Sequence, residues 1–113
     1  YKVLDIVSDK GTETISLKIS EFLLVKSADN YVELFYSEGT EIKKKLMRST
    51  LKNIESALTP YPNFVRCHRM YIVNINNIEH IKKNSNNYWI IFNGLTEQIP
   101  ISRQYLFLFK SMI

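Results

Sequence analysis

The feature that most constrains the fold is a succession of short strand-like segments separated by tight polar turns. Ser37-Glu38-Gly39 and Asn93-Gly94 are turn sequences, and each is flanked by residues typical of strands. Such residues favour strands over helices, and a length of 113 residues suits one domain rather than two. The sequence therefore predicts a mainly β fold, a compact set of short antiparallel sheets in a single domain.

The predicted strands follow from apolar alternation and from short apolar runs. Ile15, Leu17 and Ile19 alternate with polar neighbours, which indicates a half-buried strand preceded by a turn at Asp9-Lys10-Gly11. Further strands are predicted at 22–26, 31–36, 40–47, 64–73, 78–82, 88–92 and 95–99, the last two joined by a two-residue hairpin turn.

Two short peripheral helices complete the prediction. Each begins after a serine that can cap its first turn, Ser49 for one helix and Ser102 for the other. Each carries apolar residues at helical spacing, which would face the core. These residues are Leu51, Ile54 and Leu58 in the first helix, and Leu106 and Phe109 in the second.

Charge and composition restrict the partners and the cellular setting. The net charge of +4 and the isoelectric point of about 9.2 favour anionic partners. Cys67 is the single cysteine, so no internal disulfide can form, and we expect a reducing, cytoplasmic setting. No apolar run is long enough to span a membrane. The sequence begins at Tyr1 without a methionine, so we expect it to be part of a longer protein.

Catalytic and metal-binding patterns are poor. Cys67 and His68 are adjacent, but neighbouring side chains of a strand point to opposite faces and cannot act as a nucleophile and its base. Two histidines and one cysteine do not have the spacing of metal ligands. We therefore expect no enzyme activity, no metal and no cofactor.

The cationic side chains fall into groups near predicted strand ends and turns. One of Arg66 and Arg69 is expected to pair with a carboxylate, because their segment is too apolar to be wholly exposed. Lysines on a strand can also simply protect a sheet edge. Charge alone thus leaves nucleic-acid binding open beside a β protein-interaction module that docks an acidic partner. The groups are Lys43 to Lys45 with Arg48, Arg66 to Arg69, His80 with Lys82 and Lys83, and Arg103.

Four segments, in their order, resemble a known family. FLLVKSADNYVEL is followed by RSTLKNIESAL, then by FVRCHRMYIVNINNI and finally by IPISRQY. This order resembles the LytTR DNA-binding domain of bacterial response regulators, and the resemblance covers about residues 13–112. The most specific parts are the Phe-x-Arg-x-His-Arg block at Phe64 to Arg69 and the Pro-x-Ser-Arg block at Pro100 to Arg103.

The resemblance implies sequence-specific binding of duplex DNA for transcription regulation. It implies loops that enter successive major grooves at promoter direct repeats, paired domains, and an upstream receiver or sensor domain outside this chain. Matching positions assign DNA contacts to the loop of Asn30 and Tyr31, to Arg69 and to Arg103. Lys44, Lys45, Ser49 and Ser102 are expected to lie beside phosphates. Arg66 and His68 are expected to buttress their strand and its loop, and Asn74 is a further supporting residue.

Overall fold

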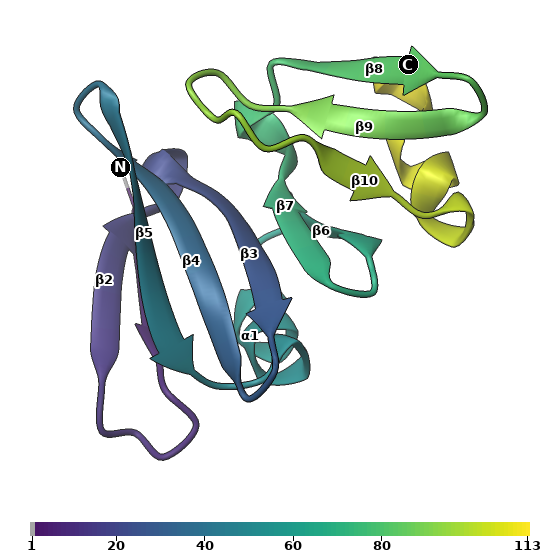
Figure 1. The fold of residues 1–113 in the computed structure, drawn as a ribbon. Coiled ribbons are helices and arrows are strands. Elements are labelled where there is room, and N and C mark those ends of the chain that lie inside the picture. Colours follow the sequence, from purple (N-terminus) through teal and green to yellow (C-terminus); the bar gives the residue numbers. More distant parts are fainter. Residues whose placement is uncertain (1) are drawn as a thin grey trace.

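Three antiparallel sheets make up most of the computed structural model, which describes residues 2–113 (Figure 1). Two short helices and two single helical turns complete it, so the predicted mainly β class is confirmed. The strands are β1 (Val3–Val7), β2 (Thr14–Lys18), β3 (Phe22–Ala28), β4 (Tyr31–Glu38), β5 (Glu41–Arg48), β6 (Phe64–His68), β7 (Tyr71–Asn74), β8 (His80–Asn84), β9 (Asn87–Ile91) and β10 (Ile99–Ile101). The helices are α1 (Leu51–Leu58) and the 3-10 helix η3 (Arg103–Met112), and the single turns are η1 (Ile19–Glu21) and η2 (Ile75–Asn77).

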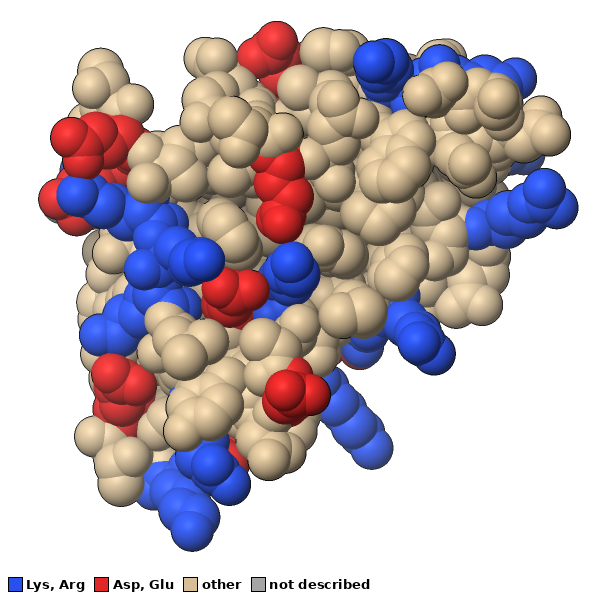
Figure 2. Space-filling view, viewed as in Figure 1, with Lys and Arg blue, Asp and Glu red and all other residues tan. Residues whose placement is uncertain are grey.

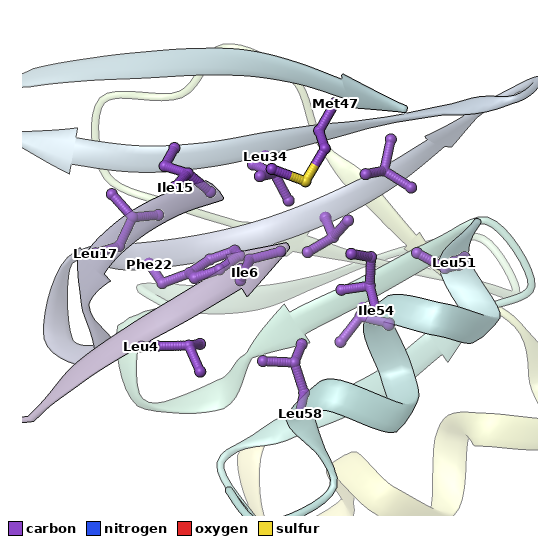
Figure 3. Packing of buried hydrophobic residues seen from close by; sticks show 13 residues of the cluster. Leu4, Ile6, Ile15, Leu17, Phe22, Leu34, Met47, Leu51, Ile54 and Leu58 are labelled. Atoms are coloured by element: carbon purple, nitrogen blue, oxygen red, sulfur yellow. The ribbon is translucent and has the colours of Figure 1, made fainter. Parts of the chain in front are cut away.

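The central sheet has five strands in the order β5-β4-β3-β7-β6, and the other two sheets pack against its two faces. On one side, β1, β2 and α1 enclose a first core, into which Leu51, Ile54 and Leu58 point from the helix (Figure 3). On the other side, β8, β9, β10 and η3 enclose a second core that includes Phe109. The middle strand β3 is buried from both sides, which explains its continuous apolar run.

The cap of helix α1 differs from the prediction. Thr50, and not Ser49, is the N-cap residue, and its hydroxyl accepts a hydrogen bond of 3.1 Å from the backbone N–H of Asn53. Ser49 is only 1% exposed, and no hydrogen-bond partner for its Oγ is found within residues 2–113. The strand–helix junction buries the first of two adjacent hydroxyl residues and leaves the second beside the helix end.

Replacing Thr50 with alanine should therefore weaken the protein. We expect the free energy of unfolding to fall by about 1 kcal/mol, because the N–H of Asn53 loses its acceptor. Urea denaturation would measure this change. Thr50→Ser should keep most of the stability, and Ser56→Ala, at an exposed position within α1, is the matched control. Equal stability of Thr50→Ala and the wild type would show that the cap contributes nothing.

Two predicted connections are wrong. Residues 64–73 are not one strand, because the chain turns at Arg69-Met70 and pairs β6 with β7. The predicted two-residue hairpin at Asn93-Gly94 is also absent, since β9 and β10 pair only from Ile90 with Ile99 onward. A turn does exist there, with φ +84° at Gly94. Phe92, just before this turn, is 1% exposed in the second core.

Candidate nucleic-acid interface

The turn between β3 and β4 brings Asn30 and Tyr31 to one end of the five-stranded sheet. Asp29 occupies the left-handed region with φ 57°, a conformation that aspartate and asparagine tolerate better than most residues. Asn30 is exposed, and its carbonyl accepts a hydrogen bond of 3.2 Å from the N–H of Ser49. Tyr31 begins β4 with 39% of its surface exposed. This turn therefore presents an amide and a phenol to solvent.

The turn between β6 and β7 presents Arg69 at the same end of the sheet. Arg66 Nη1 donates a hydrogen bond of 2.6 Å to the Arg69 carbonyl, and His68 Nδ1 accepts one of 3.1 Å from the N–H of Met70. Arg66 also pairs with Glu55 of α1 at 3.0 Å, which confirms that one arginine of this segment meets a carboxylate. Arg66 and His68 thus hold the turn, and the Arg69 side chain is exposed.

The connection from β10 to η3 presents Arg103 beside that turn. The N–H of Ser102 donates a hydrogen bond of 2.9 Å to the carbonyl of Cys67 on β6. Ser102 stands at the start of η3, but its side chain forms no cap hydrogen bond, contrary to the prediction. Ser102 is half-buried and Arg103 is exposed.

These three segments form what we call the contact edge: Asn30-Tyr31, Arg69-Met70 and Ser102-Arg103. Backbone hydrogen bonds link neighbouring segments, from Ser27 N to Met70 O at 2.8 Å and from Ser102 N to Cys67 O. In Figure 1 the three connections follow one another along the lower right of the molecule. Figure 2 shows Lys and Arg side chains projecting along that side. Within residues 2–113, neither Arg69 nor Arg103 forms an ion pair.

Three of the remaining predicted residues are not free to bind DNA, because two are paired with carboxylates and one is buried. Lys44 pairs with Glu33 at 3.0 Å and Lys45 pairs with Glu13 at 3.3 Å, both from the middle of β5. Ser49 is too deeply buried to reach a phosphate from its present position. Proximity in sequence predicts these residues near phosphates, but it reports neither the carboxylates that the fold brings beside the two lysines nor the burial of Ser49.

Asn74 supports the fold at the opposite end of β3 and β7. It is 1% exposed, and its Nδ2 donates hydrogen bonds of 3.1 Å to the Ile19 carbonyl and 2.9 Å to the Phe22 carbonyl. Its Oδ1 accepts from Asn63 Nδ2 at 3.0 Å and from the N–H of Asn76 at 3.1 Å. All four hydrogen-bonding positions of the amide are used, so the role of Asn74 is structural.

Arg48 is a candidate contact residue that the sequence prediction did not include among the sites. The β4–β5 register places it opposite Tyr31, and its guanidinium carbon lies 5.7 Å from the centre of the Tyr31 ring. Arg48 is exposed, and its ion pair with Asp9 is long, at 3.8 Å. The sequence signal did not give this pairing, because the hairpin turns at Gly39-Thr40 and the predicted turn at Ser37-Glu38-Gly39 would set a different register.

The adjacent Cys67 and His68 do not form a catalytic pair. Cys67 is 0% exposed, and burial raises the pKa of its thiol to about 12. The His68 ring bonds the N–H of Met70 instead of the thiol. A thiol that stays protonated at neutral pH is a poor nucleophile. The contact that this segment does make, from His68 to Met70, holds the β6–β7 turn.

Burial of His68 predicts a pH-dependent stability. Burial, with the nearby Arg69 guanidinium, lowers the pKa of His68 below its ordinary 6.5. The unfolded chain therefore takes up the proton first, and the free energy of unfolding should fall as pH drops below about 6.5 towards the folded pKa. Denaturation at about pH 7.5 and 5.5 would measure this dependence. We expect the stability difference between wild type and His68→Gln to shrink at the lower pH; a constant difference would contradict it.

Metal-binding clusters and membrane-spanning helices are absent from residues 2–113. Within residues 2–113, no group of three or more side chains is placed to hold a metal ion. Over the same residues, no helix has the length and apolar character needed to cross a membrane.

Comparisons with known proteins agree with the resemblance. The sequence matches the family model of the LytTr DNA-binding domain over residues 12–113. A transcriptional regulatory protein of Escherichia coli, BtsR, is 35% identical over 99 residues, which cover 86% of this chain and 38% of that protein. An uncharacterized response regulatory protein of Vibrio cholerae is 32% identical over 104 residues, 91% of this chain and 39% of its relative. The chain thus spans about two fifths of the length of these relatives.

A solved structure supports the fold. A LytTr DNA-binding domain from Bacillus cereus superimposes with a TM-score of 0.70 and 22% sequence identity. The superposition covers 99% of this chain and 96% of that chain. The family match extends over nearly all of the sequence and the fold agrees with it. This chain belongs to the LytTr family of DNA-binding domains.

Proposed function

We propose that this domain binds duplex DNA sequence-specifically and serves transcription regulation. The observation that carries the proposal is the contact edge, where three connections present to solvent an asparagine and two arginines that form no ion pair within residues 2–113. Arginine can bond two acceptors of guanine in the major groove, and asparagine can bond adenine in the same way. We infer that the domain has no catalytic activity.

The size of the domain fits contact with more than one groove. Its longest dimension is 43 Å, and the same groove of B-DNA returns after about 34 Å. We assign Asn30, Arg69 and Arg103 to base edges. Ser102 at the contact edge, and the Tyr31–Arg48 pair, whose phenol and guanidinium suit phosphate oxygens, are assigned to the backbone. Lys44 and Lys45 remain in the proposal only as longer-range contributors to the basic field.

The context of the domain belongs to the proposal as well. We place it as a single domain over residues 1–113, with its core at about 13–112, in the C-terminal part of a longer cytoplasmic regulator. Two such domains on a direct repeat would bind more tightly than one, because the second binds at a high effective concentration. An upstream receiver or sensor domain would control that pairing.

Selection from a random pool of duplexes tests the function. Fluorescence anisotropy at two salt concentrations should show binding that weakens with salt, and sequencing of bound duplexes should enrich a short direct repeat. Salt-sensitive binding without enrichment would contradict sequence-specific binding. The alternative is a module that docks an acidic protein through the same basic residues, and an absence of DNA binding at low salt would favour it.

Arg48 and Lys45 should differ in their effects on DNA affinity. Arg48→Gln should weaken binding to all sequences alike and lower the salt dependence by about one phosphate contact, because the residue lies against Tyr31 of the contact edge. Lys45→Gln removes the same charge from a residue already paired with Glu13, and its effect should be smaller. Titrations at several salt concentrations would measure both slopes. Equal slopes would remove Arg48 from the proposed site.

A further inference from the structure

One ion pair joins the two sheets that carry the contact edge. Lys26 lies on β3 of the five-stranded sheet, and Glu97 lies in the connection that leads into β10 of the three-stranded sheet. Lys26 Nζ is 3.3 Å from Glu97 Oε1, although the two residues are 71 positions apart in the sequence. The pair is half-buried, with 27% of the lysine side chain and 37% of the glutamate side chain exposed.

The surroundings of this pair make it more than an ordinary surface contact. Lys26 Nζ lies 5.8 Å from the centre of the Tyr71 ring, on the strand that follows the Arg69-Met70 turn. Burial alone would lower the pKa of Lys26, but Tyr71 and Glu97 outweigh it and the pKa is raised. No hydrogen-bond partner is found within residues 2–113 for the buried Oε2 of Glu97. Loss of Lys26 would leave that carboxylate without its positive partner.

The path of the chain connects this pair to both arginines. Ser27 follows Lys26 directly and bonds Met70, the neighbour of Arg69. Glu97 precedes β10, and Arg103 follows that strand after one residue. The far end of β10 is held by the backbone bond from Ser102 to Cys67. The ion pair at one end and the backbone bond at the other thus add polar links to the apolar contacts that β10 makes with the five-stranded sheet through Ile99 in the second core.

We propose that the Lys26–Glu97 pair is a positioning clamp, which fixes Arg103 relative to Arg69 and so sets the spacing that a DNA site must match. This inference rests on the proposed function, because the spacing matters only if both arginines contact DNA. Preorganised contacts need supporting residues that hold them at a fixed separation. Without the ion pair, the segment that leads into β10 would be held by the second core and the Ser102–Cys67 bond but by no polar link of its own, and the spacing would vary more.

Two single substitutions with opposite charge changes separate positioning from simple electrostatics. Lys26→Gln lowers the net charge by one and Glu97→Gln raises it by one. A purely electrostatic effect would weaken DNA binding in the first variant and strengthen it in the second. The clamp predicts roughly three- to tenfold weaker binding to the selected site in both, within the coupling range of contacting residues. Affinity for random duplex should instead follow the net charge, falling in Lys26→Gln and rising in Glu97→Gln.

The exchanged variant, Lys26→Glu with Glu97→Lys, restores both the pair and the net charge. It should recover most of the lost affinity for the selected site. Lack of recovery, or tighter selective binding by Glu97→Gln, would overturn the clamp. Thermal unfolding of every variant shows whether the fold is retained.

A distance measurement tests the clamp without DNA. Spin labels on cysteines introduced at the exposed positions Lys52 and Asn86 report the separation of α1 from the β8–β9 turn, and buried Cys67 should stay unlabelled. The distance distribution should broaden in both single variants and narrow again in the exchanged variant. Unchanged distributions would overturn the clamp. A wild type that shows no sequence selection would instead contradict the proposed function, while the distances still decide the clamp.

Discussion

Replacing Arg69 and Arg103 together with alanine is expected to remove most of the sequence-specific affinity. Each arginine assigned to a base contact should contribute about 1–3 kcal/mol, so the double variant should lose roughly 2–6 kcal/mol if the contacts are independent. Binding to random duplex should fall much less. Anisotropy titrations with the selected site and with a scrambled site would give both values.

The double variant should remain folded, which makes its result interpretable. Both side chains are exposed, and neither forms an ion pair within the described residues 2–113. A double alanine variant of Lys82 and Lys83, exposed on β8, removes the same charge elsewhere and is the matched control. Full affinity for the selected site in the Arg69→Ala, Arg103→Ala variant would remove both residues from the proposed site.

Replacing Phe22 with alanine is expected to have the largest effect on stability. Phe22 is 0% exposed at the start of β3, and its ring meets Phe64 edge to face at 5.3 Å between centroids. Removal of a buried phenyl ring costs about 3–5 kcal/mol, through lost burial and the cavity left behind. Domains have total stabilities of about 5–15 kcal/mol, so the variant should be close to unfolding.

Urea denaturation of Phe22→Ala would measure this loss. Phe107→Ala is a matched control, because Phe107 is 63% exposed on η3 and its truncation should change the free energy of unfolding by less than about 0.5 kcal/mol. Phe22→Leu should fall between the two. A loss below about 1.5 kcal/mol for Phe22→Ala would show that the first core collapses around the gap without cost.

The strand class and most local turns could be predicted from the sequence. The turn at Asp9-Lys10-Gly11 joins β1 and β2. The β4–β5 turn lies at Gly39-Thr40, slightly later than predicted, because Ser37 and Glu38 still pair with Ile42 and Glu41. Alternation of buried and exposed residues in β2 matches the prediction through Leu17, although the strand ends at Lys18 before Ile19. These features depend on neighbours in sequence, where side-chain periodicity and backbone preference act directly.

The wrong predictions concern places where the core competes with a local signal. Asn93-Gly94 has the composition of a two-residue hairpin, but β9 and β10 pair only from Ile90 with Ile99 onward, while Phe92 packs in the second core. Ser49 and Thr50 are both able to cap a helix, and packing of the junction decides in favour of Thr50. Periodicity reports none of these long-range contacts.

The sequence by itself determined that this chain is a β domain with a basic character, and the order of its motifs determined its family. The tertiary structure decided which cations remain available. Lys44 and Lys45 meet carboxylates and Arg66 meets Glu55, whereas Arg69 and Arg103 stay exposed. A side chain's charge is a property of its residue type. Its freedom to bind an anion depends on what the folded chain places beside it.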